Sequence, residues 1–284
     1  MENHSLRRLI AYIQENGSER DVLRLNTAMG DEEAKNKLLD HFSELQCSSG
    51  AFPYRLQKGD IESFMHTYMA YEFLKEIGDL KQKNTIIERM VNFIEKSQKE
   101  PGFWNENMCL LEIPDLPFWL NPQDKNVELL TTAYSTLIMV IERHTSSTTR
   151  KGIEYLSKHQ TATGTFPGFP HITWIGGAAL LGYYGTFYTV SHKIISTIDD
   201  LLDQDQPGSI FQWIASSLLL VGFSPRSLSI LSRSLDKLEK SQQSTGLWTS
   251  EDEGTELQTT VGCLITLDLS GRINLKSIYI NKSG

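Results

Sequence analysis

The sequence predicts an all-α fold, in which six helical hairpins close into an α6/α6 toroid with an amphipathic outer ring and an apolar inner ring. A turn motif occurs four times, each copy ends a charged amphipathic stretch, and an uncharged stretch follows three of the copies. A helix that is apolar on all sides is buried on all sides, so the uncharged stretches are expected to form the inner ring. We expect a single toroid domain over residues 1–284.

The repeated motif is a Gln, followed by Gly four residues later and by Phe or Trp two residues after that. Its copies are Gln46-Gly50-Phe52, Gln98-Gly102-Trp104, Gln160-Gly164-Phe166 and Gln242-Gly246-Trp248. Glycine at the C′ position ends a helix, because it enters the left-handed conformation easily. The Gln side chain can bond backbone groups that are unpaired at helix ends, and the ring can fill the corner. We expect these residues to stabilise the fold and not to touch substrate.

The motif also sets the boundaries of the hairpins. The uncharged runs cover residues 129–141, 171–190, 209–222 and 257–267. Motif-containing hairpins are expected over residues 31–78, 81–143, 148–186 and 225–269. A degenerate hairpin over residues 5–30 turns at Gly17, and another over residues 188–222 turns at Pro207-Gly208.

Composition excludes some classes of function. Twenty-seven Lys and Arg against 35 Asp and Glu give a net charge of −8, which argues against a general nucleic-acid binder. Cys47, Cys109 and Cys263 are too far apart in the sequence for a disulfide framework or a zinc CxxC pair. The N-terminal residues lead into an amphipathic stretch and not into an apolar signal core. We therefore expect a cytoplasmic protein, with peripheral membrane association as an additional expectation.

These repeated turns resemble the QW-type repeats of the superfamily of squalene-hopene cyclases, class II terpene cyclases and protein prenyltransferase β-subunits. Residues 50–74 and 164–185 look like its repeat unit. The resemblance implies an apolar central cavity, a linear isoprenoid substrate and acid-initiated carbocation chemistry. The sequence departs from the family in three ways. It has no DxDD acid motif and no Asp-x-Cys zinc pair, and its length fits one barrel where the full-length cyclases have two.

Glu62, Asp60 and Glu128 are the candidate catalytic acids. Each is expected at the N-terminus of an inner helix, where a class II cyclase carries its acid, and Asp60 and Glu62 stand two residues apart. Burial in an apolar cavity raises the pKa of a carboxyl and keeps its proton available. A helix N-terminus favours the anion instead, so helix capping is the alternative role.

Inner-helix aromatic side chains are candidates for the wall of a substrate site. Ring faces stabilise carbocations through cation–π interactions, whereas a centre that is simply packed shut is the alternative. His66 is the one imidazole in the set and could tune the pKa of a neighbouring acid. The candidate substrate-binding residues are Phe64, His66, Tyr68, Tyr134, Trp174, Tyr183, Phe211 and Trp213.

No metal or other cofactor is expected, with one alternative. Asp199, Asp200 and Asp203 spell DDxxD, which resembles the magnesium motif of class I terpene synthases. Three acids near the C-terminal end of a helix oppose its dipole, which favours a solvated face. A Mg²⁺-dependent terpene synthase or prenyltransferase that ionises a diphosphate is the corresponding alternative function.

Residues 105–125 form an unusually long connection that is rich in apolar side chains, including Leu110, Leu111, Phe118 and Trp119. Such a composition argues against disorder, and long loops in compact domains are usually functional. We interpret the connection as a lid over the cavity, or as an apolar surface that contacts a membrane or a partner protein through residues 110–120.

The leading function is therefore an isoprenoid cyclase with a non-standard acid motif. A non-catalytic toroid that binds a lipid or a protein is an alternative of a different class, and a carbohydrate-active toroid with paired carboxylates is another. One buried carboxyl in a wide apolar cavity would favour the cyclase. A filled centre would favour the binding protein, and an open polar groove would favour the sugar enzyme.

Overall fold

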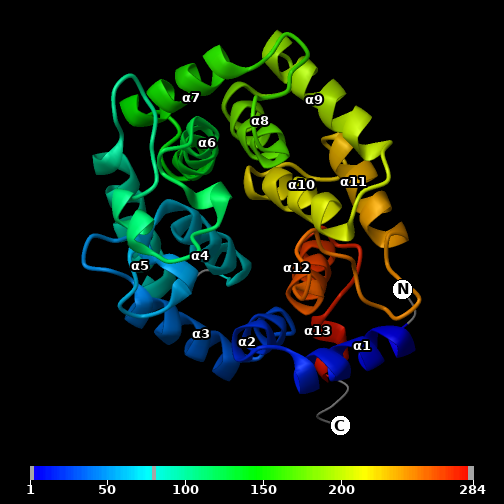
Figure 1. The fold of residues 1–284 in the computed structure, drawn as a ribbon. Coiled ribbons are helices and arrows are strands. Elements are labelled where there is room, and N and C mark those ends of the chain that lie inside the picture. Colours follow the sequence, from blue (N-terminus) through cyan, green and yellow to red (C-terminus); the bar gives the residue numbers. More distant parts are fainter. Residues whose placement is uncertain (1–2, 79–80, 281–284) are drawn as a thin grey trace. The chain divides into compact units, whose positions relative to one another are not determined.

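The computed structural model describes residues 3–78 and 81–280, and regular structure within them is almost entirely helical (Figure 1). This confirms the predicted all-α class. The α-helices are α1 (Asn3–Asn16), α2 (Glu19–Ala28), α3 (Glu32–Leu45), α4 (Phe64–Glu76), α5 (Lys81–Ser97), α6 (Lys125–Glu142), α7 (Ser147–His159), α8 (Pro170–Tyr184), α9 (Thr189–Leu202), α10 (Gly208–Leu220), α11 (Ser229–Lys240), α12 (Glu256–Leu269) and α13 (Lys276–Ile280).

Short elements lie in the connections. The 3₁₀-helices η1 (Tyr54–Leu56), η2 (Met108–Glu112) and η3 (Phe118–Leu120) accompany an antiparallel pair of strands, β1 (Phe52–Pro53) and β2 (Glu62–Ser63). The helices α1 to α12 follow the predicted order of hairpins, with Gly17 between α1 and α2 and Pro207 directly before α10. The five residues of α13 are too few for a periodic signal and are not predicted. The closure of the hairpins into a ring stays a prediction.

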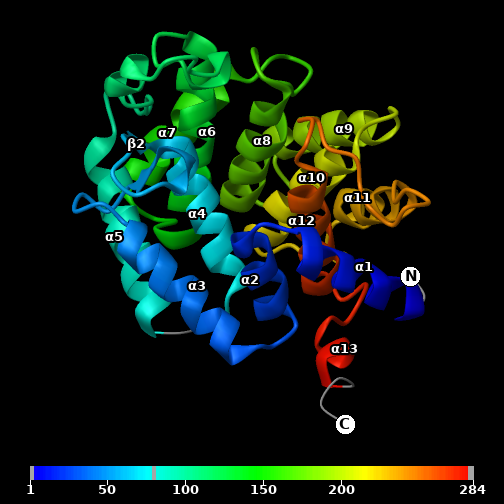
Figure 2. The ribbon, with the colours of Figure 1, turned by 60° about the horizontal axis from the view of Figure 1, so that its bottom comes forward.

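The chain divides into two compact units. The terminal unit contains residues 1–40 and 200–284, and the central unit contains residues 41–199. Within the central unit α6 packs against both α4 and α8, while α5 packs on α4 and α6, and α7 packs on α6 and α8 (Figure 2). Within the terminal unit α10 packs against α11 and α12, and α12 packs against α2. The expectation of one domain over residues 1–284 stays a prediction.

Most of the uncharged runs are buried, as expected. Every residue in 127–140, 172–181 and 260–267 is buried. The run 171–190 does not stay helical to its end, because α8 stops at Tyr184 and Gly185 has a φ of 74°. In the described residues no helix has both the length and the apolar composition that a membrane span requires.

The motif glutamines join each turn to the helices around it. In every copy the side-chain amide donates to the carbonyl oxygen of the motif glycine, at 2.8 to 3.3 Å. Gln46 also donates to the Ile86 carbonyl in α5, and Gln98 to the Thr148 carbonyl in α7, both at 2.9 Å. These bonds agree with the structural role predicted for the motif.

The motif glycine is not the C′ residue that the sequence predicts. In α7 the C-cap is Gln160, so the helix has ended four residues before Gly164. The glycine is the last residue of a tight turn, in which the Gly164 N–H donates to the Thr161 carbonyl and the Thr161 N–H donates to the Thr165 carbonyl. The same pair of bonds occurs in residues 47–51, 99–103 and 243–247, and the four glycines have φ values of 90° to 137°.

Three of these glycines lie directly on the backbone of a later amphipathic helix. A Cβ added to Gly50 would lie 2.2 Å from the Arg89 carbonyl oxygen of α5. The corresponding distances are 2.4 Å from Gly102 to the Lys151 oxygen of α7, and 2.6 Å from Gly164 to the Lys193 oxygen of α9. Real Cβ atoms do not approach backbone oxygens this closely, so both conformation and contact require glycine here.

The motif aromatic residues bond to the helices that follow them, α4, α6, α8 and α12, through their backbones. The N–H groups of Phe52, Trp104, Phe166 and Trp248 donate to the hydroxyl oxygens of Thr67, Thr132, Thr173 and Thr260, at 2.9 to 3.2 Å. The indoles of Trp104 and Trp248 donate back to carbonyls of their own outer helices at 2.7 Å. Each turn therefore bonds the helix that follows it, and the two tryptophan turns also bond the helix that precedes them.

We expect Gly102→Ala to lower the free energy of unfolding by about 3 kcal/mol, because it combines an unfavourable φ with a clash against α7. The matched control is Gly59→Ala, since Gly59 has a φ of 90° and no atom within 4 Å of its added Cβ. The control should lose only about 1 to 2 kcal/mol, the conformational term. Chemical denaturation of both variants measures the difference, and equal losses would contradict the role of the close contact.

Candidate functional site

The strongest candidate site lies at the N-terminus of α4. Ser63 is the N-cap of this helix, and the carboxylate at its first turn is Glu106, which comes from the connection after Trp104. Glu106 accepts hydrogen bonds from the N–H groups of Phe64 and Met65, at 2.9 and 2.7 Å, and from the Ser63 hydroxyl at 3.2 Å. A carboxylate that is distant in the sequence thus caps an inner helix.

Glu106 has the electrostatic property expected of the catalytic acid. Glu106 is buried, with 3% of its surface exposed. Desolvation raises the pKa of its carboxyl above the ordinary value of 4.5, and hydrogen bonds from Met65, Phe64 and Ser63 offset part of that rise. The Glu106 carboxyl therefore keeps its proton to a higher pH than an exposed glutamate does.

Two tyrosine rings pack together beside this carboxyl. The ring centroids of Tyr68 in α4 and Tyr134 in α6 are 4.2 Å apart, and both side chains are buried. The Tyr68 hydroxyl donates to Glu72 Oε1 at 3.0 Å. Burial raises the pKa of the Tyr134 hydroxyl, and the charges of Glu72 and Glu106 raise it further, so both carboxylates act on this hydroxyl.

His66 connects to the same carboxyl through the N-cap serine. Its Nδ1 lies 2.9 Å from Ser63 Oγ, and the Ser63 hydroxyl donates to Glu106. Its ring meets the Tyr54 ring edge-on at 5.0 Å, which holds the imidazole in place. We refer to Ser63, His66, Tyr68, Glu106 and Tyr134 together as the Glu106 site.

The two carboxylates predicted before α4 have other surroundings. Asp60 is exposed, and it does not cap the helix because Ser63 does. Glu62 is half-buried in β2 and accepts a hydrogen bond from the Ser49 hydroxyl at 2.7 Å. The pKa of the Cys47 thiol is raised mainly by burial and then by the Glu62 charge. The helix begins later than predicted because residues 62 and 63 pair with β1.

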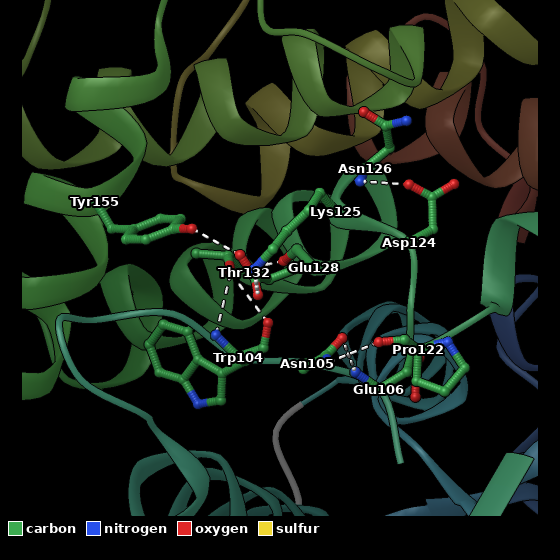
Figure 3. A network of polar contacts seen from close by, with 10 residues as sticks. All are labelled: Trp104, Asn105, Glu106, Pro122, Asp124, Lys125, Asn126, Glu128, Thr132 and Tyr155. Atoms are coloured by element: carbon green, nitrogen blue, oxygen red, sulfur yellow. Dashed lines mark hydrogen bonds and ion pairs between the residues drawn. The ribbon is translucent and has the colours of Figure 1, made fainter. Parts of the chain in front are cut away.

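Glu128 lies in the first turn of α6, as expected, and is buried there. Figure 3 shows its carboxylate between Tyr155 and Lys125. Its Oε1 accepts from the Tyr155 hydroxyl at 2.8 Å and its Oε2 from the Lys125 ammonium at 2.7 Å. The bond to Tyr155 joins the start of α6 to α7.

The connection over residues 105–125 is ordered by a small apolar cluster. Leu110 and Leu120 are buried against Tyr54. The Asn105 side-chain amide donates to the Pro122 carbonyl at 2.8 Å, which joins the two ends of the connection (Figure 3). The large apolar side chains that remain exposed are those of Met108, Leu111 and Phe118, at 51%, 43% and 72%. The connection therefore covers the start of α4 and carries an apolar outer surface.

Of the other predicted substrate-binding residues, Phe64 reaches the Glu106 site through its backbone N–H, which donates to Glu106. Phe64 packs on Phe93 with ring centroids 4.9 Å apart, Trp174 packs on His171 at 4.9 Å, and Tyr183 stacks on His144 at 5.0 Å. Within the described residues the buried indole N–H of Trp174 has no hydrogen-bond partner. Phe211 and Trp213 belong to α10 in the terminal unit, where Phe211 is buried and Trp213 is half-buried.

One of the DDxxD aspartates, Asp203, forms a surface ion pair. Asp203 accepts from the Arg233 guanidinium at 2.7 Å, Asp200 is exposed, and Asp199 is half-buried. In the part of the chain that the structure describes, no three His, Cys, Asp or Glu side chains are grouped closely enough to hold a metal ion.

A cavity of about 120 Å³ lies in the terminal unit, lined by Glu239, Gln242, Leu267 and Ile273. An engineered cavity of about 150 Å³ accommodates benzene, so this one is too small for an isoprenoid chain. None of its lining residues belongs to the Glu106 site or to the predicted substrate-binding residues.

Comparison with known proteins supports the fold and leaves the function open. No family model matches the chain, and no curated protein matches it. The chain is similar in structure to a solved protein from Actinoplanes, with a TM-score of 0.61 and 13% sequence identity. The match covers 94% of this chain and 99% of that chain. At this identity the similarity shows a shared fold alone.

The raised pKa of Glu106 predicts a pH-dependent effect of Glu106→Gln on stability. Between 4.5 and the raised value the folded chain binds more protons than the unfolded chain, so this group makes stability fall as pH rises. Glu106→Gln lacks this contribution to the pH dependence of stability. Its free energy of unfolding should therefore increase relative to wild type over this window, by at most about 1.4 kcal/mol per pH unit.

Denaturant titrations across the acidic and neutral range measure this difference. Glu112→Gln, which removes an exposed carboxylate from the same connection, is the reference for loss of a charge alone. A Glu106→Gln difference that stayed constant with pH would contradict the raised pKa.

Proposed function

We propose that the chain binds a linear isoprenoid at the Glu106 site and acts on it as an acid-initiated cyclase or isomerase. The observation that carries this proposal is the buried Glu106 carboxyl, with its raised pKa, at the N-terminus of α4 beside the Tyr68–Tyr134 ring pair. In the family that the repeats resemble, the catalytic acid is expected at this end of an inner helix. Glu106 takes the role that the sequence assigned to Glu62 or Asp60.

The proposed reaction conserves all atoms. The Glu106 carboxyl gives its proton to the less substituted carbon of the terminal double bond, which leaves a tertiary carbocation, and a second double bond of the same chain attacks that cation. The ring faces of Tyr68 and Tyr134 stabilise the positive charge, each by about 0.5 to 2 kcal/mol. Loss of a proton from the product cation returns the carboxylate to its acid form.

The surface of α4 offers an apolar approach to this site. Met65 and Met69 are half-buried, whereas most of the residues around them in the helix are buried. Met65 also packs on the apolar cluster of the 105–125 connection. Methionine side chains adapt to irregular apolar partners, which suits a flexible hydrocarbon chain. Access would require the connection to move away from the start of α4.

Glu106→Gln tests the acid. The amide keeps the shape and loses the proton, so turnover of linear prenyl alkenes and epoxides should fall at least about 100-fold while binding is retained. Glu128→Gln is the matched control, because Glu128 is also buried at the start of an inner helix. Product analysis by mass spectrometry and titration of intrinsic tryptophan fluorescence provide the two readouts. Unchanged products from Glu106→Gln would refute the assignment.

The same assay with and without Mg²⁺ distinguishes the diphosphate alternative. A strict requirement for Mg²⁺ that is lost in Asp199→Asn or Asp200→Asn would move the chemistry to the DDxxD motif. Equal turnover with and without Mg²⁺ would favour the carboxyl at the Glu106 site.

A non-catalytic binding protein is the second candidate, favoured by the exposed Met108, Leu111 and Phe118. Glu112 and Asp115 beside them are exposed, and an acidic rim suits a basic amphipathic helix as the partner. Leu111→Ser and Phe118→Ser should then weaken binding of a cationic Leu/Lys model helix about tenfold each, measured by fluorescence anisotropy. Binding that is indifferent to both substitutions would remove this candidate.

A further inference from the structure

The exposure pattern of α4 defines a stripe that leads away from the Glu106 site. Of the 13 residues of this helix, the ones that are not buried are Met65, Met69, Glu72, Lys75 and Glu76. Residues 65, 69, 72 and 76 follow the three- and four-residue spacing of one helix face, and we refer to them as the α4 stripe. Its first residue lies at the acid, because the Met65 N–H donates to the Glu106 carboxylate at 2.7 Å.

The α4 stripe changes from apolar to acidic along its length. It begins with two methionines beside the acid and ends with two glutamates toward the C-terminus of the helix. The Tyr68 hydroxyl donates to Glu72 Oε1 at 3.0 Å, so the tyrosine pair of the Glu106 site also holds the first of these carboxylates. From Met65 to Glu72 the helix rises about 10 Å. A short hydrocarbon chain that reaches Glu106 with one end can therefore reach Glu72 with the other.

The charges at the acidic end of the stripe disfavour a phosphate group. Both glutamates of the stripe lie near the C-terminus of α4, where the helix dipole is negative. Lys75, beside them, pairs with Glu142 of α6 at 3.3 Å. Lys83 is buried, and its ammonium donates to the Ile77 carbonyl at the end of α4, at 3.1 Å. These two lysines are thus directed at protein oxygens, and the stripe itself presents two carboxylates to a ligand.

We propose that the isoprenoid bound at the Glu106 site carries a primary alcohol, and not a diphosphate, at the end remote from the reacting double bond, and that this hydroxyl donates a hydrogen bond to Glu72. A carboxylate has about four lone-pair sites, so Glu72 can accept this bond while it holds Tyr68. The bond is charge-assisted, which makes it about twice as strong as a bond between neutral groups. The two methionines contact the hydrocarbon between the carboxyls. The assignment of Glu72 rests on the proposed function.

Binding of geraniol and of geranyl diphosphate tests the head group, because the two compounds share one hydrocarbon chain. Each is titrated without Mg²⁺ into the Glu106→Gln variant, in which bound ligand is not turned over, and binding is followed by intrinsic tryptophan fluorescence. Geraniol should bind at least about tenfold more tightly than geranyl diphosphate. Failure of both compounds to bind, or binding of the diphosphate as tightly as the alcohol, would overturn the proposal.

Glu72→Gln, made in the same variant, tests the residue that selects the head group. The amide still accepts from Tyr68 but carries no negative charge, so the preference for geraniol should fall about tenfold. Glu44→Gln is the matched control, because it removes an exposed carboxylate of α3 in the central unit, and it should leave the preference unchanged. Tyr68→Phe keeps the ring and loses the hydroxyl that holds Glu72, so the preference should fall several-fold. An unchanged preference in Glu72→Gln would reject Glu72 as the selecting residue.

Turnover by the wild-type chain separates the head group from the acid chemistry. Cyclisation of geraniol and geranyl diphosphate at equal rates without Mg²⁺ would leave the acid assignment standing and refute the head-group assignment. Cyclisation of neither compound, together with a binding preference that depends on Glu72, would refute the acid chemistry and support the head-group assignment.

Discussion

The contact between each QxxxG turn and the backbone of the next outer helix is the constraint on which the central unit depends. At Gly50, Gly102 and Gly164 the turn lies so close to a helical carbonyl oxygen that there is no room for a Cβ. The glutamine at the start of the turn bonds the glycine carbonyl, so the turn keeps its shape while it makes this contact. The spacing of neighbouring hairpins is therefore set by backbone atoms and not by adaptable side chains.

The position of Glu106 follows from one of these turns. The backbone N–H and carbonyl of Trp104 both bond the Thr132 hydroxyl of α6, and the Trp104 indole bonds the Ile94 carbonyl of α5. Trp104 is thus fixed to both helices of its hairpin, and Glu106 follows two residues later at the start of α4. The bonds that fix Trp104 therefore also determine where the buried Glu106 carboxyl lies.

The helices and turns can be predicted from the sequence because the patterns that indicate them lie within each element. Charge periodicity separates the amphipathic helices from the uncharged, buried helices, and the motif marks the turn between them. The Glu106 site cannot be predicted in this way, because Ser63 and Glu106 are 43 residues apart in the sequence. The sequence-based prediction starts α4 too early, because nothing in the sequence indicates that Glu62 pairs with β1. One signal was available: Glu106 follows its motif aromatic by two residues, where the other copies have Tyr54, Gly168 and Ser250.

The fourth motif glycine differs from the others in a way that bears on how such repeats are recognised. An added Cβ at Gly246 would meet only Leu9 Cδ1, at an ordinary distance of 3.8 Å. The φ of 90° is therefore the one remaining reason for glycine at this position. Asparagine and aspartate are the other residues that enter positive φ most readily. During divergence this copy alone is free to exchange glycine for asparagine without losing its contact. A search pattern that insists on glycine in every repeat would then count one hairpin too few in related chains.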